Sequence, residues 1–138
     1  MIRFTIACIA LVVLVASGLR GAHTGSVIAA QAAPSGKAIF ETNCATCHQA
    51  QGDGLPDAVP PLAKNAYVSG NPKAVIHTVL YGKKGPIKVN GKPYDATMPA
   101  WKKSLKPGEI AAVITFIRTS FGNKGKAVTE KQVLAVKK

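Results

Sequence analysis

Beyond residue 34, apolar residues recur at helical spacing in separate stretches of the chain. The longest stretch begins at Pro107, and one of its faces carries Ile110, Val113, Ile114, Ile117 and Phe121. A second stretch lies between Asn71 and Gly82, residue types that begin and end helices, and its apolar stripe is Val75, Ile76, Val79 and Leu80. These patterns predict helices over residues 107–120 and 71–82.

Two shorter helices are indicated by their capping residues. Ser35 is a candidate N-cap for a helix over residues 35–43, and Thr129 and Gln132 have the spacing of a capping box near the C-terminus. The remaining stretches are rich in glycine and proline, and only Asn90-Gly91 suggests a tiny hairpin or tight turn. We therefore predict an all-α fold of three to four short helices.

The first 33 residues follow a different pattern. Arg3 precedes an apolar run over residues 4–17, and a small-residue site follows at Ala30-Gln31-Ala32. The run is shorter than the roughly 20 residues that span a bilayer, so it resembles the core of a secretory signal. We expect residues 1–33 to be a signal peptide, or an anchor through residues 4–19 followed by a linker. Either reading places the domain of residues 34–138 outside the cytoplasm, in the periplasm or exported, soluble or anchored.

The composition of the chain excludes several classes of function. The chain has 138 residues, 18 Lys and Arg against 6 Asp and Glu, a net charge of +12 and three cysteines. It lacks a glycine-rich phosphate loop, has too few carboxylates for a Ca²⁺ or Mg²⁺ cage, and too few cysteines for a disulfide-stapled scaffold. The positive charge makes an acidic protein, nucleic acid or an anionic membrane a candidate partner. We expect no nucleic-acid partner for an exported protein.

Cys44, Cys47 and His48 form the motif C-x-x-C-H, which is the attachment signature of c-type haem. Two thiols at this spacing can each form a thioether with one haem, and the next residue can offer its imidazole to the iron. A dithiol redox pair would need a βαβ context, and a structural zinc site would need a fourth ligand. The motif thus favours covalent haem c with its iron, which would also fill the middle of a domain with few large apolar side chains.

Met98 is the candidate for a second axial ligand. It is the only methionine after the predicted signal, and it precedes Pro99 in an irregular stretch, whereas core methionines lie on helices or strands among apolar neighbours. His77 points away from the apolar stripe of its predicted helix and is read as a surface residue. His23 lies in the signal or linker.

With these motifs in this order, the chain resembles a class I c-type cytochrome, monohaem, bacterial and exported, over about residues 35–125. The resemblance is carried by Gly36 to Phe40 before Cys44, by Pro60-Pro61-Leu62, and by Met98-Pro99-Ala100-Trp101. It implies that the carbonyl of Pro60 accepts a hydrogen bond from His48, that Leu62 touches the haem face, and that His48 and Met98 ligate the iron. It also implies that Gly36 and Phe40 pack against Val113, Phe116 and Ile117.

One departure from this family is Lys106, which stands where relatives commonly have Ser or Thr as the N-cap of the last long helix. Lysine cannot accept the capping hydrogen bond, so we expect Ser104 to compensate or the helix end to fray.

An iron with both axial positions filled by protein has no place for a substrate. We therefore expect an electron carrier between redox proteins and not an enzyme. Its partners would be an oxidase, a reductase or a dehydrogenase with an acidic docking face. The alternative is a haem sensor or peroxidase-like enzyme in which Met98 is a labile ligand.

Overall fold

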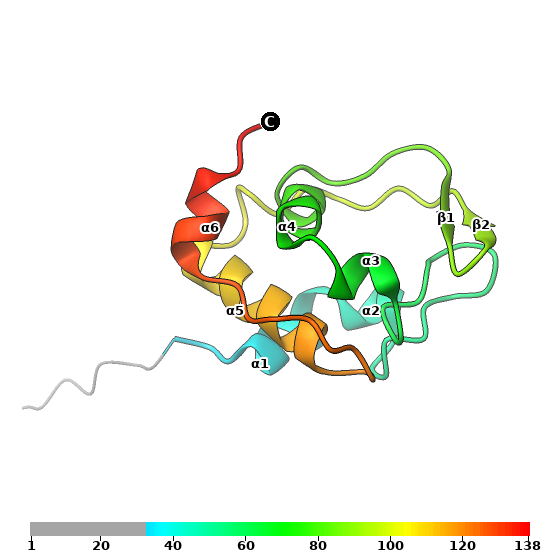
Figure 1. Ribbon diagram of the computed structural model, residues 1–138, viewed down its shortest axis with the longest axis horizontal. Helices are drawn as coiled ribbons and strands as arrows, with labels where there is room; N and C mark the ends of the chain where they lie inside the picture. The colour runs from blue at the N-terminus through cyan, green and yellow to red at the C-terminus, as the bar shows by residue number, and fades with distance from the viewer. Residues whose placement is uncertain (1–32) are drawn as a thin grey trace, which may run out of the picture. The chain divides into compact units, whose positions relative to one another are not determined.

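The computed structural model describes residues 33–138, and helices dominate this part of the chain (Figure 1). In order, its elements are α1 (Gly36–Asn43), α2 (Ala45–His48), α3 (Ala66–Ser69), α4 (Pro72–Tyr81), β1 (Ile87–Val89), β2 (Lys92–Tyr94), α5 (Pro107–Thr119) and α6 (Glu130–Ala135). The predicted all-α class is confirmed. The predicted number of three to four helices is wrong, because the described residues contain six, and two of these have only four residues.

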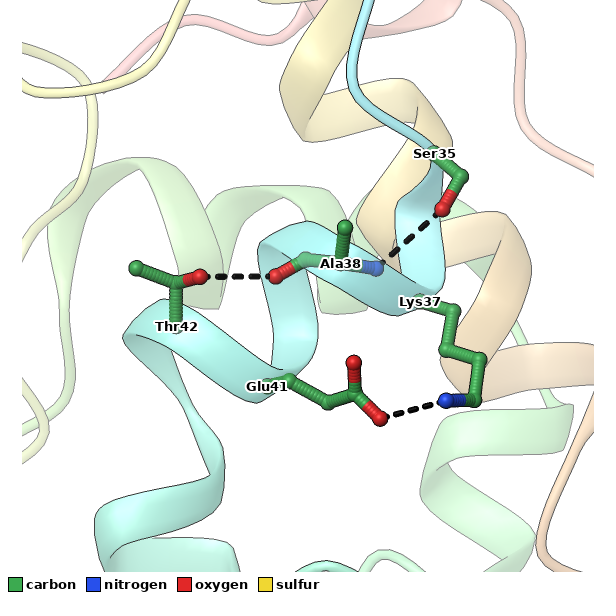
Figure 2. A network of polar contacts seen from close by, with 5 residues as sticks. All are labelled: Ser35, Lys37, Ala38, Glu41 and Thr42. Atoms are coloured by element: carbon green, nitrogen blue, oxygen red, sulfur yellow. Dashed lines mark hydrogen bonds and ion pairs between the residues drawn. The ribbon is translucent and has the colours of Figure 1, made fainter.

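The helix ends follow from local chemistry. Ser35 caps α1 by accepting from the Ala38 N–H at 3.2 Å, and Figure 2 shows this bond beside the Lys37–Glu41 ion pair. Thr42 donates its hydroxyl to the Ala38 carbonyl at 2.9 Å. These polar contacts occupy the exposed side of α1, which leaves Ile39 and Phe40 for the core.

The other predicted caps are also present. Asn71 caps α4 by accepting from the Lys73 N–H at 2.9 Å, and Thr129 and Gln132 form the capping box of α6. At the start of α5, the Lys106 side chain caps nothing. Instead the Glu109 carboxylate accepts from the Lys106 backbone N–H at 2.7 Å. The expected compensation by Ser104, or fraying, is therefore wrong: an acidic residue in the first turn caps this helix.

The centre of the fold is the contact between α1 and α5. A Cβ on Gly36 would collide with the carbonyl of Ala112, so only glycine allows this close approach. The ring of Phe40 lies 5.5 Å from that of Phe116 and 5.2 Å from that of Phe121. The expected packing of Gly36 and Phe40 against Phe116 is confirmed. The structure adds Ala112 as a contact of Gly36 and Phe121 as a contact of Phe40.

The helix α4, the short α3 and the C-terminal α6 cover α5 (Figure 1). Residues 128–136 pack back on the core through Val128, Val133 and Val136, and the Tyr81 hydroxyl donates to the Val136 carbonyl at 3.3 Å. The predicted hairpin is confirmed as the antiparallel pair β1–β2, with Val89 opposite Lys92. It lies at the opposite end of the domain from α6 (Figure 1).

No helix among residues 33–138 is long and apolar enough to cross a membrane. The predicted signal peptide, the predicted anchor over residues 4–19, and His23 lie outside the described residues.

Candidate functional site

The two cysteines are brought together by a short helical turn. Cys44 ends α1 and begins α2, and its carbonyl accepts from the N–H groups of Cys47 and His48 at 3.2 and 2.9 Å. The chain therefore places Cys47 and His48 within one turn of Cys44. Both cysteines are free of a disulfide. Burial, and to a smaller extent the neighbouring Cys47, raises the pKa of the Cys44 thiol to about 11, so this thiol is protonated near neutrality.

His48 is buried, and its ring is oriented by a backbone carbonyl. Its Nδ1 lies 3.2 Å from the carbonyl oxygen of Pro60. A carbonyl can only accept, so Nδ1 carries the proton and Nε2 keeps a free lone pair. Burial lowers the pKa of His48, and the bond to Pro60 acts in the opposite direction. The result is a neutral imidazole, the form that binds a metal ion.

Met98 lies on the irregular segment that follows the hairpin, where it is half-buried. Its N–H donates to the Lys83 carbonyl at 2.9 Å, and its own carbonyl accepts from the Lys83 N–H at 3.0 Å. Gly82 has a φ of 75°, and a Cβ there would lie 2.5 Å from the Met98 carbonyl oxygen. The backbone of Met98 is thus fastened to the end of α4 by one reciprocal pair of hydrogen bonds.

These side chains face a common cavity of about 240 Å³. The walls come from α3, α4, the hairpin and α5, and they are mainly apolar, with Val75, Val79, Val113, Ile117 and Leu105 among them. All six predicted site residues line it: Cys44, Cys47, His48, Pro60, Leu62 and Met98. An apolar cavity with two thiols, one imidazole and one thioether fits an iron macrocycle bound through sulfur and nitrogen.

His77, which was predicted to be a surface residue, does not line the cavity. His77 is exposed on α4, and its ring packs against that of Tyr81 at an interplanar angle of 52°, with centroids 4.9 Å apart. Within residues 33–138 there is no group of three or more His, Cys, Asp or Glu side chains able to hold a metal ion. Helices surround the motif in this range, without the βαβ unit that a dithiol redox pair would need.

Comparison with known proteins agrees with this arrangement. The profile of the family described as Cytochrome c matches residues 33–121. The chain belongs to the cytochrome c family. It therefore carries covalently bound haem c with iron.

The relatives of this cytochrome include a cytochrome of similar length and longer subunits of a dehydrogenase and an oxidase. A cytochrome c-552 of Thermus thermophilus is 35% identical over 136 residues, covering 83% of this chain and 89% of the relative. The cytochrome c subunit of the quinone alcohol dehydrogenase of Gluconacetobacter polyoxogenes is 39% identical over 90 residues, covering 64% of this chain but only 19% of the subunit. The CcoP subunit of a Cbb3-type cytochrome c oxidase of Azospirillum brasilense is 32% identical over 101 residues, 69% of this chain and 30% of the subunit. The chain thus spans about a fifth of the dehydrogenase subunit.

Positive charge lies around the cavity of the cytochrome. Lys83 and Lys88 line it, and both are exposed. Among the described residues the one ion pair is Lys37–Glu41, so the other lysines of this range are not neutralised by a salt bridge. The exposed lysines of the hairpin region and of the segment before α5 are Lys83, Lys84, Lys88, Lys92, Lys102, Lys103 and Lys106.

Sequence reasoning missed three buried polar residues near the site: Asn65, Asn123 and Arg118. The Arg118 guanidinium donates to the carbonyls of Val68, Ser69 and Lys126, which joins α3 and the C-terminal segment to α5. Asn65 and Asn123 bond to each other and to the chain around Leu62. The Arg118 and Asn123 side chains donate to the carbonyls of Val68 and Leu62, which lie 50 and 61 positions away in the sequence, and no local pattern reveals such pairs.

Proposed function

We propose that this cytochrome is a one-electron carrier in which Cys44 and Cys47 attach the haem by thioethers and His48 and Met98 are the axial ligands. The observation that supports this assignment is that all four side chains line one apolar cavity. When bound, the haem supplies an iron that cycles between the ferrous and ferric states. Pro60 orients the His48 ring by accepting its Nδ1–H, and Leu62, which lines the cavity, would contact the face of the bound haem.

The backbone around Met98 favours the carrier over a sensor or a peroxidase-like enzyme. Both of those functions need a distal ligand that leaves the iron easily. Here the reciprocal hydrogen bonds with Lys83 hold Met98 at the end of α4, and Gly82 permits the close approach. With two protein ligands in place, the iron has no free position for a substrate, and the cytochrome exchanges electrons without transforming a substrate.

The partners of this carrier are redox proteins with an acidic docking face. The support is the unpaired positive charge beside the cavity, which steers an acidic partner toward it and makes the association rate fall with added salt. Relatives named as subunits of dehydrogenases and of an oxidase suggest these as partner classes. We place the domain of residues 34–138 outside the cytoplasm, with residues 1–33 as its signal peptide or anchor.

Two measurements on the purified protein test the proposal. Its intact mass should exceed the peptide mass by one haem, and Cys44→Ala or Cys47→Ala should leave a single thioether. The ferric protein should show the near-infrared band of methionine bound to iron, and it should bind cyanide slowly. Rapid cyanide binding without that band would instead favour a sensor or peroxidase-like function.

A further inference from the structure

The segment Pro60-Pro61-Leu62 is held in place by side chains. Prolines have no N–H, so the first two residues of the segment cannot donate to a neighbouring strand or turn. Its three carbonyls each accept from a side chain. Pro60 accepts from His48 Nδ1 at 3.2 Å, Pro61 from Asn65 Nδ2 at 2.7 Å, and Leu62 from Asn123 Nδ2 at 2.8 Å. The two asparagines thus fix the residues that directly follow the carbonyl bound to His48.

Both asparagines are buried, with 5% of Asn65 and 7% of Asn123 exposed. The Asn65 backbone N–H donates to Asn123 Oδ1 at 2.9 Å, and Asn123 Nδ2 also donates to the Ile117 carbonyl near the end of α5 at 2.9 Å. Buried amides with every partner satisfied make a rigid connection, because losing a partner leaves an unpaired polar group in the core.

This hydrogen-bonded connection ends on α5, and α5 also supports the segment that carries His48. Asn123 joins the segment to α5, while α5 packs against α1, which runs directly into Cys44 and α2. The Pro60 carbonyl and the His48 ring are therefore both positioned relative to α5. Asn123 also lies outside the residues 33–121 that match the family profile.

We infer that Asn65 and Asn123 are positioning residues that hold the Pro60 carbonyl on His48 Nδ1–H and thereby help to set the reduction potential of the cytochrome. The inference rests on the proposed function, in which His48 ligates the iron. A histidine that donates this hydrogen bond is a more basic ligand, which favours ferric iron. Loosening the segment should weaken the bond and raise the potential.

The variant Asn65→Ser separates this role from helix capping. Asn65 Oδ1 accepts from the Tyr67 N–H at 2.9 Å and so caps α3, and serine can keep that bond without adding charge. Serine is shorter and lacks the amide Nδ2 that donates to the Pro61 carbonyl. We expect a reduction potential above that of the wild type. In the ferrous protein, the His48 Nδ1 proton should exchange with solvent about fivefold to tenfold faster, as measured by NMR.

The matched control is Asn71→Ala, which removes the N-cap of α4 and touches nothing in the segment 60–62. It should lower thermal stability but keep the wild-type potential and proton exchange. Asn123→Ala should raise the reduction potential further than Asn65→Ser does. If Asn123→Ala does not fold, Asn65→Ser and the Asn71→Ala control still test the inference.

Two results would overturn the inference while the proposed function stands. In the first, the wild type has the methionine-to-iron band but Asn65→Ser keeps the wild-type potential and exchange rate. In the second, Asn65→Ser and Asn71→Ala shift the potential equally. A wild-type protein without histidine and methionine ligation would overturn the proposed function itself, and with it this role.

Discussion

The two sides of the cavity are built differently. On the His48 side, Leu62 and Ala63 donate to the Gly52 carbonyl, Gly54 donates to the His48 carbonyl, and two buried asparagines hold the next turn. On the Met98 side, residues 83–100 contain two buried side chains, Val89 and Tyr94, and are joined to α4 through Lys83. The fold itself therefore positions the histidine. We infer that the hydrogen bonds with Lys83 hold the backbone of Met98, and that the rest of residues 83–100 depends for much of its order on the proposed bond between Met98 and iron.

Removal of the haem should have the largest effect on the two sides of the cavity. The double variant Cys44→Ala, Cys47→Ala should yield a haem-free chain whose cavity is open between α3, α4 and α5. Cofactor sites contribute folding free energy directly, so little helix should remain in far-UV circular dichroism. A haem-free chain with wild-type helix content would show that the α1–α5 pair suffices for folding.

Met98→Ala tests the Met98 side of the cavity. The variant should lose the near-infrared band and bind cyanide rapidly. Its potential should fall by on the order of tenths of a volt, because axial ligands set haem potentials over about 0.8 V. Helix content should change little. His77→Ala is the control, since His77 is exposed on α4 and does not line the cavity. Loss of low-spin character in the His77 variant would mean that the second ligand is a histidine.

Phe40→Ala tests the helix pair that supports the His48 side. Phe40 is 1% exposed and packs on Phe116 and Phe121. Its truncation should reduce the free energy of unfolding by about 3–5 kcal/mol, as measured by denaturant titration. The near-infrared band should persist in the folded state. A variant that loses the band while its stability is unchanged would contradict the assignment of the two sides.

Glu109→Ala should have the smallest effect. It removes the carboxylate that accepts from the Lys106 N–H and complements the start of α5. We expect a loss of about 0.5–1 kcal/mol in the free energy of unfolding. Reduction potential should not change, because Glu109 does not line the cavity. Glu130→Ala is the control for the helix-dipole part of this loss, because Glu130 lies in the first turn of α6, whose N-cap N–H is bound by Gln132 instead.

The parts of the fold with strong local signals could be predicted from the sequence. The helices α1, α4, α5 and α6 have apolar stripes or capping residues, and Asn90-Gly91 indicated the hairpin. The helices α2 and α3 were missed because four residues are too few to show a helical period. The capping of α5 was missed because the acceptor is the third residue of the helix and not its N-cap.

The residues of the site also divide into those that the sequence could predict and those that it could not. The C-x-x-C-H motif and the lone methionine before Pro99 identified four lining residues, and resemblance to c-type cytochromes added Pro60 and Leu62. Asn65 and Asn123 gave no signal. They are 58 positions apart: Asn123 accepts from the Asn65 backbone N–H and donates to the Leu62 carbonyl, and only folding brings these groups near one another.

The most direct test of the difference between the two sides is one denaturant titration followed by two signals. The near-infrared band reports the proposed bond between Met98 and iron, and far-UV circular dichroism reports the helices. We predict that the band disappears at a lower denaturant concentration than that at which helicity falls, because the Met98 segment opens before α1 and α5 separate. Coincident loss of both signals at every concentration would contradict this account.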